Sequence, residues 1–195
     1  MSLVVLTGAV RSGKSAMAEE LAASRGLDVV AAVAGWDGDD EMVRRIDAHR
    51  ASRPGEWTTL HIDADPAWIA AVAGDAVLLL DCLGTLISHL CYDAVGDGEI
   101  APDGAEEAVA ASVDVLLTAL LARIGDTIVV TNETGWGVVP AWPSARIFRD
   151  ELGRANRRLI AAADAACLVV DGRCLDLKNL PERPTWPSTH EEGDR

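Results

Sequence analysis

The amino-acid sequence predicts a three-layer α/β domain around a mostly parallel β-sheet. Two observations carry this prediction. Short, unbroken apolar runs alternate with longer amphipathic segments from end to end of the chain, and such runs are typical of parallel strands that helices cover on both faces. A glycine-rich turn joins the first apolar run directly to the first amphipathic segment, as in α/β folds that bind ligands at the ends of strands.

The predicted strands are four or five residues long and mostly rich in Val, Ile and Leu. They are Leu3–Thr7, Val29–Val33, Val77–Asp81, Thr127–Thr131 and Cys167–Val170. The predicted helices are Lys14–Ser24, Asp40–Ala51, Pro66–Val72, Gly84–Tyr92, Glu106–Arg123 and Ala145–Ala163. We expect Ser144 to be the N-cap of the last helix. We expect one domain over residues 1–180 and an irregular polar tail over 181–195, where prolines are frequent.

The charge balance excludes several classes of function. The chain has 195 residues with 17 Lys+Arg against 31 Asp+Glu, a formal net charge of −14. Such an acidic protein repels phosphate backbones, which argues against a nucleic-acid partner or an anionic membrane surface. No apolar stretch has the length of a membrane span, and residues 1–15 lack the pattern of a signal peptide. We therefore expect a cytoplasmic protein.

The four cysteines show no zinc or redox spacing. They are Cys82, Cys91, Cys167 and Cys174. Three of them lie in or beside apolar runs, so we expect buried free thiols in a reducing compartment.

Residues 8–15 match the phosphate-binding pattern G-x-x-x-x-G-K-[ST], between a predicted strand and a predicted helix. Its members are Gly8, Ala9, Val10, Arg11, Ser12, Gly13, Lys14 and Ser15. The glycines let backbone N–H groups turn toward a phosphate, and the following helix N-terminus adds its dipole. Lys14 is expected to bridge β- and γ-phosphate oxygens and the Ser15 hydroxyl to bind Mg²⁺. The pattern predicts a nucleoside triphosphate site in a P-loop NTPase-like domain.

Asp81 ends the apolar run Val77–Asp81, which has the form of a Walker B strand. This carboxylate is the second expected Mg²⁺ group, beside Ser15. The alternative is that Asp81 merely caps the helix that begins near Gly84.

Two further segments allow both a functional and a plain structural interpretation. Residues 39–50 form a charged helical pattern in which Arg45 and His49 share a face at i, i+4; on spacing alone this is equally a solvated surface helix. Residues 131–140, TNETGWGVVP, leave a predicted strand through a loop with two glycines. That loop is either an ordinary strand exit or a ligand-binding loop at the carboxyl end of the sheet.

These segments together resemble the bifunctional adenosylcobinamide kinase / adenosylcobinamide-phosphate guanylyltransferase enzymes of cobalamin biosynthesis. The resemblance covers about residues 3 to 178 and rests on TGAVRSGKS, DDEMVRRIDAHRASRPGEW, the DCL after Val77–Leu80, TNETGWGVVP and RIFRDELGRAN. It implies two reactions. ATP or GTP phosphorylates the aminopropanol hydroxyl of adenosylcobinamide, and GMP from GTP is then transferred to that phosphate to give adenosylcobinamide-GDP.

The resemblance also implies roles for particular residues. His49 matches the histidine that carries GMP as a covalent intermediate, which suits a neutral imidazole attacking a phosphorus. Positions matching nucleotide-contacting segments are Ala34, Gly35, Trp36, Arg50, Ala51, Ser52, Arg53 and His61. Arg50 and Arg53 would offset triphosphate charge; the alternative for His61 is a surface histidine. The family further implies a homo-oligomer, a trimer, with corrinoid and nucleotides as its partners.

Some positions have a structural alternative or depart from the family pattern. Glu133, Arg146, Arg149 and Asp150 match family positions, but Arg146 and Asp150 are also spaced for a helical salt bridge. The departures from the usual family residues are Ala34, His61, Gly84 and Arg157. Two other functions explain part of the pattern: a monofunctional small-molecule P-loop kinase and a non-catalytic nucleotide-binding module.

Overall fold

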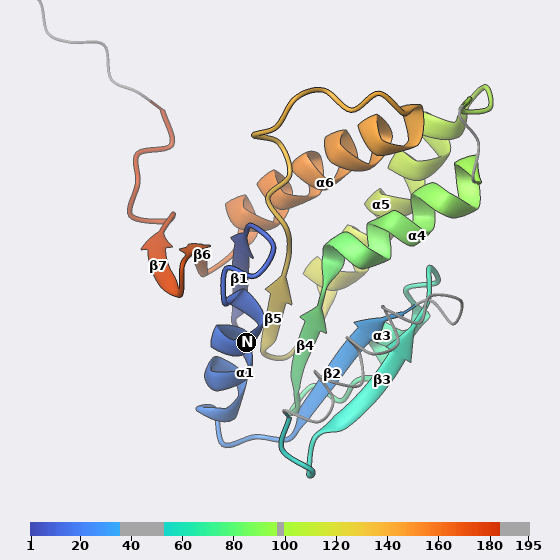
Figure 1. The fold of residues 1–195 in the computed structure, drawn as a ribbon. Coiled ribbons are helices and arrows are strands. Elements are labelled where there is room, and N and C mark those ends of the chain that lie inside the picture. Colours follow the sequence, from blue (N-terminus) through green and yellow to red (C-terminus); the bar gives the residue numbers. More distant parts are fainter. Residues whose placement is uncertain (36–52, 97–99, 184–195) are drawn as a thin grey trace, which may run out of the picture.

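The structure is a computed structural model that describes residues 1–35, 53–96 and 100–183. Seven strands form one sheet in the order β3-β2-β4-β5-β1-β6-β7 (Figure 1). The strands are β1 (Leu3–Gly8), β2 (Val29–Ala34), β3 (Thr58–Ile62), β4 (Val77–Asp81), β5 (Thr127–Val130), β6 (Ala165–Val170) and β7 (Arg173–Asp176). All neighbours pair in parallel except β6 and β7. The predicted fold class, α/β with a mostly parallel sheet, is confirmed.

Helices cover both faces of this sheet. The described helices are α1 (Lys14–Ala23), α3 (Ala67–Ala71), α4 (Leu83–Val95), α5 (Ala105–Ala122) and α6 (Pro143–Ala162). α1 packs on one face against β1, β4 and β5, whereas α4, α5 and α6 pack against one another on the opposite face (Figure 1). None of the helices in the described ranges is long and apolar enough to cross a membrane.

The central strand β4 shows why the apolar runs are unbroken. Val77 and Leu79 belong to the core under α1, while Leu78 and Leu80 belong to the core under α4, α5 and α6. All four side chains are fully buried. Each such leucine contributes about 1.5–3 kcal/mol of burial free energy, so the sheet is held from both sides.

Two strands escaped the sequence prediction, and both are edge strands. β3 has the sequence TTLHI with mixed exposure, and β7 has the sequence RCLD with every residue exposed. A strand with one neighbour and little cover needs no continuous apolar run. The signal that marks the central strands is therefore missing from the two edges.

The helix α6 begins earlier than the sequence predicted, and its N-cap is a different residue. The helix begins at Pro143, and its N-cap is Trp142 rather than Ser144. Proline suits the first helical position because its missing N–H would have no partner there and its φ is already helical. The bounds of the other described helices differ from the predicted ones by at most three residues.

The prediction of four free thiols is wrong for two of them. Cys167 on β6 and Cys174 on β7 form a disulfide with a Cα–Cα distance of 5.5 Å, while Cys82 and Cys91 are free. The antiparallel pairing of β6 and β7 brings the two cysteines together. That pairing could not be anticipated without recognising β7.

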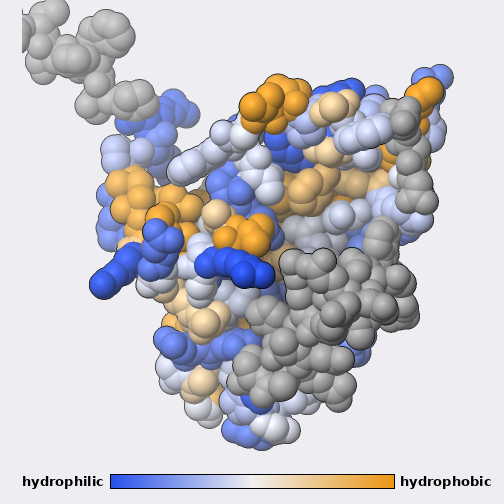
Figure 2. All heavy atoms as spheres, in the orientation of Figure 1, coloured by the Kyte–Doolittle hydropathy of each residue, from blue (hydrophilic) through white to orange (hydrophobic). Residues whose placement is uncertain are grey.

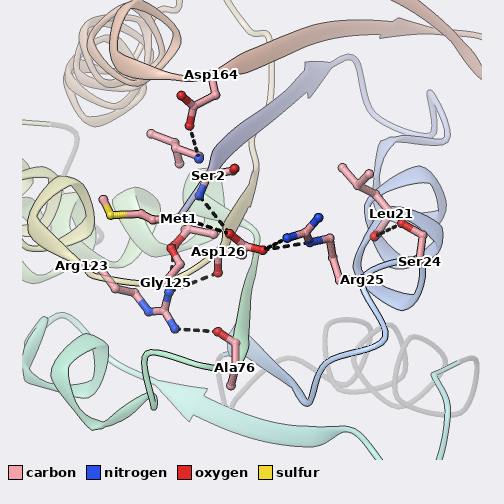
Figure 3. Close-up of polar contacts among 12 residues, drawn as sticks. Met1, Ser2, Leu21, Ser24, Arg25, Ala76, Arg123, Gly125, Asp126 and Asp164 are labelled. Atoms are coloured by element: carbon pink, nitrogen blue, oxygen red, sulfur yellow. Dashed lines mark hydrogen bonds and ion pairs between the residues drawn. The ribbon is translucent and has the colours of Figure 1, made fainter.

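The amino ends of the strands are fastened by charged side chains (Figure 3). Asp126 accepts hydrogen bonds from the Ser2 N–H at 2.9 Å and from Arg25 Nε at 2.8 Å. Arg123 is 6% exposed and donates through Nη1 and Nη2 to backbone oxygens of Ala73, Ala76 and Asp126 and to the Thr127 hydroxyl. These contacts tie the ends of β1, β4 and β5 together.

Candidate functional site

A cavity of about 520 Å³ opens at the carboxyl ends of the strands β1, β2 and β4, opposite the amino ends just described. Its lining residues are Val10, Arg11, Ser12, Gly13, Lys14, Ser15, Ala16, Val33, Ala34, Arg53, Asp81, Cys82, Thr85 and Asn132. Ligands of open α/β sheets bind at the carboxyl ends of strands. The cavity lies at that position.

The loop between β1 and α1, together with the first residues of α1, supplies half of the cavity lining. Gly13 has φ +94, a left-handed conformation that favours glycine. Gly8 is needed for a different reason, because a Cβ there would lie 2.4 Å from the Val169 carbonyl oxygen of β6. The loop therefore packs tightly on the sheet and leaves the first N–H groups of α1 facing the site, as an anion requires.

Lys14 is buried at the base of this loop. Its residue exposure is 7%, and its Nζ donates to the Ala9 carbonyl at 3.0 Å. Burial lowers the pKa of Lys14, while the nearby Cys82 and Asp81 act in the opposite direction. An ammonium held by a single carbonyl keeps further N–H donors for a phosphate.

The hydroxyl of Ser12 fits the same ligand. Ser12 Oγ is buried and has no hydrogen-bond partner among the described residues. Its backbone oxygen accepts from the Gly172 N–H at 2.8 Å, which braces the loop against the β6–β7 turn. A buried hydroxyl without a hydrogen-bond partner lowers the stability of the fold unless a ligand pairs with it. Phosphate oxygens would accept a hydrogen bond from Ser12 Oγ.

Asp81 lies at the end of β4 between two donors. Its Oδ1 accepts from Ser15 Oγ at 3.2 Å and its Oδ2 from Arg53 Nη2 at 3.1 Å. It does not cap α4, since the N-cap of that helix is Cys82, whose Sγ accepts from the Thr85 N–H. The capping alternative is therefore wrong, and the carboxylate faces the cavity.

Ser15 and Asp81 offer a donor set that fits Mg²⁺. A hydroxyl and a carboxylate are the hard oxygen ligands that this cation prefers, and it usually completes its shell with phosphates and water. The described residues contain no group of three His, Cys, Asp or Glu side chains arranged around a metal. A nucleotide's phosphates and water would supply the further ligands of a cation held by these two oxygens.

Five lining residues were not assigned from the sequence: Ala16, Val33, Cys82, Thr85 and Asn132. Cys82 Sγ lies 3.1 Å from Thr85 Oγ1 and 3.5 Å from Asn132 Oδ1. Burial is the main cause that raises the pKa of the Cys82 thiol, so it stays protonated and donates. Cys82 directly follows β4 and Asn132 is the second residue after β5, so their positions after neighbouring strands were the available signal.

Asn156 on α6 holds this side of the cavity. Its Nδ2 donates to the Asn132 backbone oxygen at 2.9 Å, and its Oδ1 accepts from the Thr131 hydroxyl at 2.7 Å. A Cβ at Gly84 would come within 2.8 Å of Asn132 Oδ1. The absence of a side chain at Gly84, one of the departures from the family pattern, therefore leaves room for Asn132.

The structure brings together most of the predicted site residues that it describes. Residues Val10 to Ser15, with Ala34, Arg53 and Asp81, line the cavity, and Ala9 contributes its carbonyl to Lys14. Gly35 follows β2, whereas His61 is exposed on the edge strand β3 and does not line the cavity. The predicted helix Asp40–Ala51 and five predicted site residues lie outside the described residues. Those five are Trp36, His49, Arg50, Ala51 and Ser52.

The contacts of Arg146 decide whether it forms the helical salt bridge with Asp150 that its spacing allowed. Arg146 donates to the backbone oxygens of Pro140 and Ala141, while Asp150 pairs with Arg149 at 3.0 Å. The helical pair Arg146–Asp150 is therefore not formed. Instead Arg146 fastens the end of the loop to α6.

Exposed apolar side chains gather on the same loop. Trp136 is 81% exposed and Val138 is 94% exposed, and Val139 and Trp142 are also exposed. Figure 2 shows apolar surface at the top of the view, where Figure 1 places the loop between β5 and α6.

The fold and this site define a class of protein. A phosphate-binding loop between β1 and α1, with a carboxylate at the end of a neighbouring strand, marks a P-loop nucleotide-binding protein. A prototypical ATPase from the type III secretion system of pathogenic bacteria shares the fold, with a TM-score of 0.50 and 13% identity over 86% of this chain and 50% of that chain.

Sequence comparison identifies the family within this class. The chain belongs to the cobinamide kinase / cobinamide phosphate guanyltransferase family, whose model matches residues 4–177. It is 35% identical to the bifunctional adenosylcobalamin biosynthesis protein CobU of Escherichia coli (strain K12), over 90% of this chain and 99% of that protein. It is 37% identical to the protein of the same name from Salmonella typhimurium, again over 90% and 99%.

Proposed function

We propose that this chain is a bifunctional transferase of cobalamin biosynthesis that uses one nucleotide site for two reactions. It phosphorylates the aminopropanol hydroxyl of adenosylcobinamide and then transfers GMP to the resulting phosphate. The observation that carries the proposal is the cavity in which Lys14, Ser15 and Asp81 converge, in a chain of this family.

The first reaction moves a γ-phosphoryl group from ATP or GTP. The acceptor hydroxyl oxygen forms a bond to the γ-phosphorus, the bond from that phosphorus to the β–γ bridging oxygen breaks and releases ADP or GDP, and the hydroxyl proton passes to solvent. Lys14 and the N–H groups at the start of α1 bind the phosphate oxygens and stabilise the charge that develops on them. Ser15 and Asp81 would hold Mg²⁺, which supplies charge neutralisation on the phosphates when bound.

The second reaction runs in two displacements through His49. An imidazole nitrogen bonds to the α-phosphorus of GTP, pyrophosphate leaves, and a phosphoramidate remains. A phosphate oxygen of adenosylcobinamide phosphate then bonds to that phosphorus and releases the histidine. The product is adenosylcobinamide-GDP.

Covalent geometry supports the assignment of His49. It precedes Arg53 by four residues, so their Cα atoms are separated by at most about 14 Å of extended chain. Arg53 itself lines the cavity and binds Asp81 there. The short connection therefore allows the imidazole to reach a nucleotide in the cavity.

Radiolabelled GTP tests both steps. The protein is incubated with Mg²⁺ and either α-³²P- or γ-³²P-GTP and is then denatured. We expect acid-labile, alkali-stable label from the α position alone, lost in His49→Ala. Adding adenosylcobinamide phosphate should discharge the label into adenosylcobinamide-GDP.

His89→Gln is the matched control, because His89 lies on α4 and does not line the cavity. It should label like the wild type. Phosphoryl transfer without covalent label would instead identify a monofunctional kinase. Nucleotide binding without turnover or label would identify a binding module.

The proposal extends to assembly and compartment. A corrinoid is broad, so we propose that the enzyme acts as a homo-oligomer, a trimer, in which subunits build a wide acceptor site. The reaction would take place in the cytoplasm, where its nucleotides are available. Sedimentation velocity at micromolar concentration should show a trimer, and a monomer at all concentrations would contradict it.

A further inference from the structure

Three charged side chains form a chain that runs from Glu19 on α1 through Arg53 to Asp81, and the last two line the cavity. Arg53 Nε donates to Glu19 Oε1 at 2.9 Å, and Arg53 Nη2 donates to Asp81 Oδ2 at 3.1 Å. The Arg53 side chain is 3% exposed, that of Glu19 16% and that of Asp81 11%. At this depth each charge depends on its partner, since water is largely excluded.

The two oxygens of Asp81 have separate partners. Oδ2 is held by Arg53, while Oδ1 accepts the proton of Ser15 Oγ. Because the Ser15 hydroxyl is the donor in this hydrogen bond, the lone pairs of its oxygen stay free to bind a cation. Turning the carboxylate would break both contacts, so Arg53 determines how Asp81 and Ser15 face the metal position.

Glu19 determines where Arg53 lies. Ser15 and Glu19 are four residues apart on α1, so they share one face of the helix. Arg53 also lines the cavity, and a guanidinium binds phosphate oxygens strongly. Without the Glu19 carboxylate, the guanidinium would be free to turn from Asp81 toward a bound triphosphate.

We propose that Glu19 is a positioning residue: through Arg53 it orients the Asp81 carboxylate beside the metal–triphosphate site. This inference rests on the proposed function, whose nucleotide site it refines. In this arrangement Arg53 is hydrogen-bonded to Asp81 and does not contact the phosphates. Arg11 and Lys14 are the other cationic side chains among the described lining residues. Those two, with the backbone N–H groups of the loop, remain for the phosphates.

The test measures GTP affinity of the full-length protein by calorimetry, once with Mg²⁺ and once with EDTA. The readout is the ratio of the metal-free Kd to the Mg²⁺ Kd. In Glu19→Gln we expect Mg·GTP to bind about tenfold more weakly, as when the partner of a metal ligand is removed. Metal-free GTP should bind as tightly as in the wild type or more tightly, because Arg53 can then contact it.

Glu20→Gln is the matched control, since Glu20 is the exposed neighbour on the same helix. It should keep the wild-type ratio. Adding Arg53→Met to Glu19→Gln should remove any gain in metal-free affinity, and melting temperatures check folding. If Glu19→Gln does not fold, Glu19→Met serves for the same ratio, because it keeps the length of the side chain.

The outcomes separate this inference from the function beneath it. A wild-type ratio in a folded Glu19 variant overturns the positioning role alone. Equal weakening of both affinities also overturns it, because that is the effect of general loosening. A wild-type protein that binds no nucleotide, with or without Mg²⁺, overturns the proposed function and this inference with it.

Discussion

The two ends of the sheet use similar charged residues for opposite purposes. At the amino end, Arg123 gives both Nη groups to protein oxygens while its Nε has no partner among the described residues, and Asp126 is held by Ser2 and Arg25 (Figure 3). At the carboxyl end, Lys14 has one carbonyl partner and the buried Ser12 hydroxyl has none within the described part of the chain.

This difference separates a structural clamp from a binding site. A guanidinium whose two Nη groups are both taken by protein oxygens holds the surrounding backbone together and has no Nη group left for a ligand. A buried donor with bonds to spare is retained at a cost in stability unless a ligand supplies acceptors. Substitutions at the two ends should therefore affect different measurements.

The largest expected effect is on activity, at the carboxyl end. Lys14→Met should lower phosphoryl transfer by about 10²–10³-fold, because a donor to the developing charge is lost. The melting temperature should stay level or rise, since a buried ammonium is removed. Lys178→Met, which changes the only other lysine, should leave kcat/KM unchanged; an equal loss in both variants would contradict the assignment of Lys14.

The next effect is on stability, at the amino end. Arg123→Met should lower the free energy of unfolding by about 3 kcal/mol, because buried carbonyls of the strand ends lose their donors. Urea unfolding measures this, and the Kd for GTP of the folded variant should match the wild type. Arg173→Met, at an exposed position on β7, is the control. A changed Kd with unchanged stability would reverse the assigned roles of the two ends.

Asp126 adds a pH dependence at the same end. Although burial favours its protonated form, the hydrogen bond and charge of Arg25, with the N-terminal amine, lower the pKa of Asp126 below its ordinary value of 3.8. Its stabilisation is therefore complete above that value and is lost as the pH falls toward the lower, folded-state pKa. Asp126→Asn should cost about 1 kcal/mol near neutral pH and flatten the decline of stability in acid. A decline as steep as in the wild type would exclude Asp126 as its source.

The smallest effect is expected at Cys82, which both caps α4 and lines the cavity. Cys82→Ala should lower the free energy of unfolding by about 0.5 kcal/mol through the lost cap, and Cys82→Ser should restore it. Urea unfolding of the two variants side by side measures the difference. Equal stabilities would show that the thiol does not act as a cap.

The sequence by itself determined the central fold and the phosphate-binding loop. Both depend on requirements of short segments. The strand β4 needs apolar residues on each face, and residues 8–15 need glycines where the chain turns tightly and where it passes close to the backbone of β6. Such requirements leave a pattern within a few neighbouring residues, where a sequence can be read directly.

Only the tertiary structure decided the partners. Glu19, Arg53 and Asp81 come from three distant segments, and their pairing follows from the placement of α1 beside β4. The same holds for Asn132 with Gly84, and for the disulfide that depends on the edge strand β7. Contacts between remote segments are set by packing, which leaves no periodic pattern in the sequence. The sequence therefore shows which residues are charged, but only the fold shows which of them pair with one another.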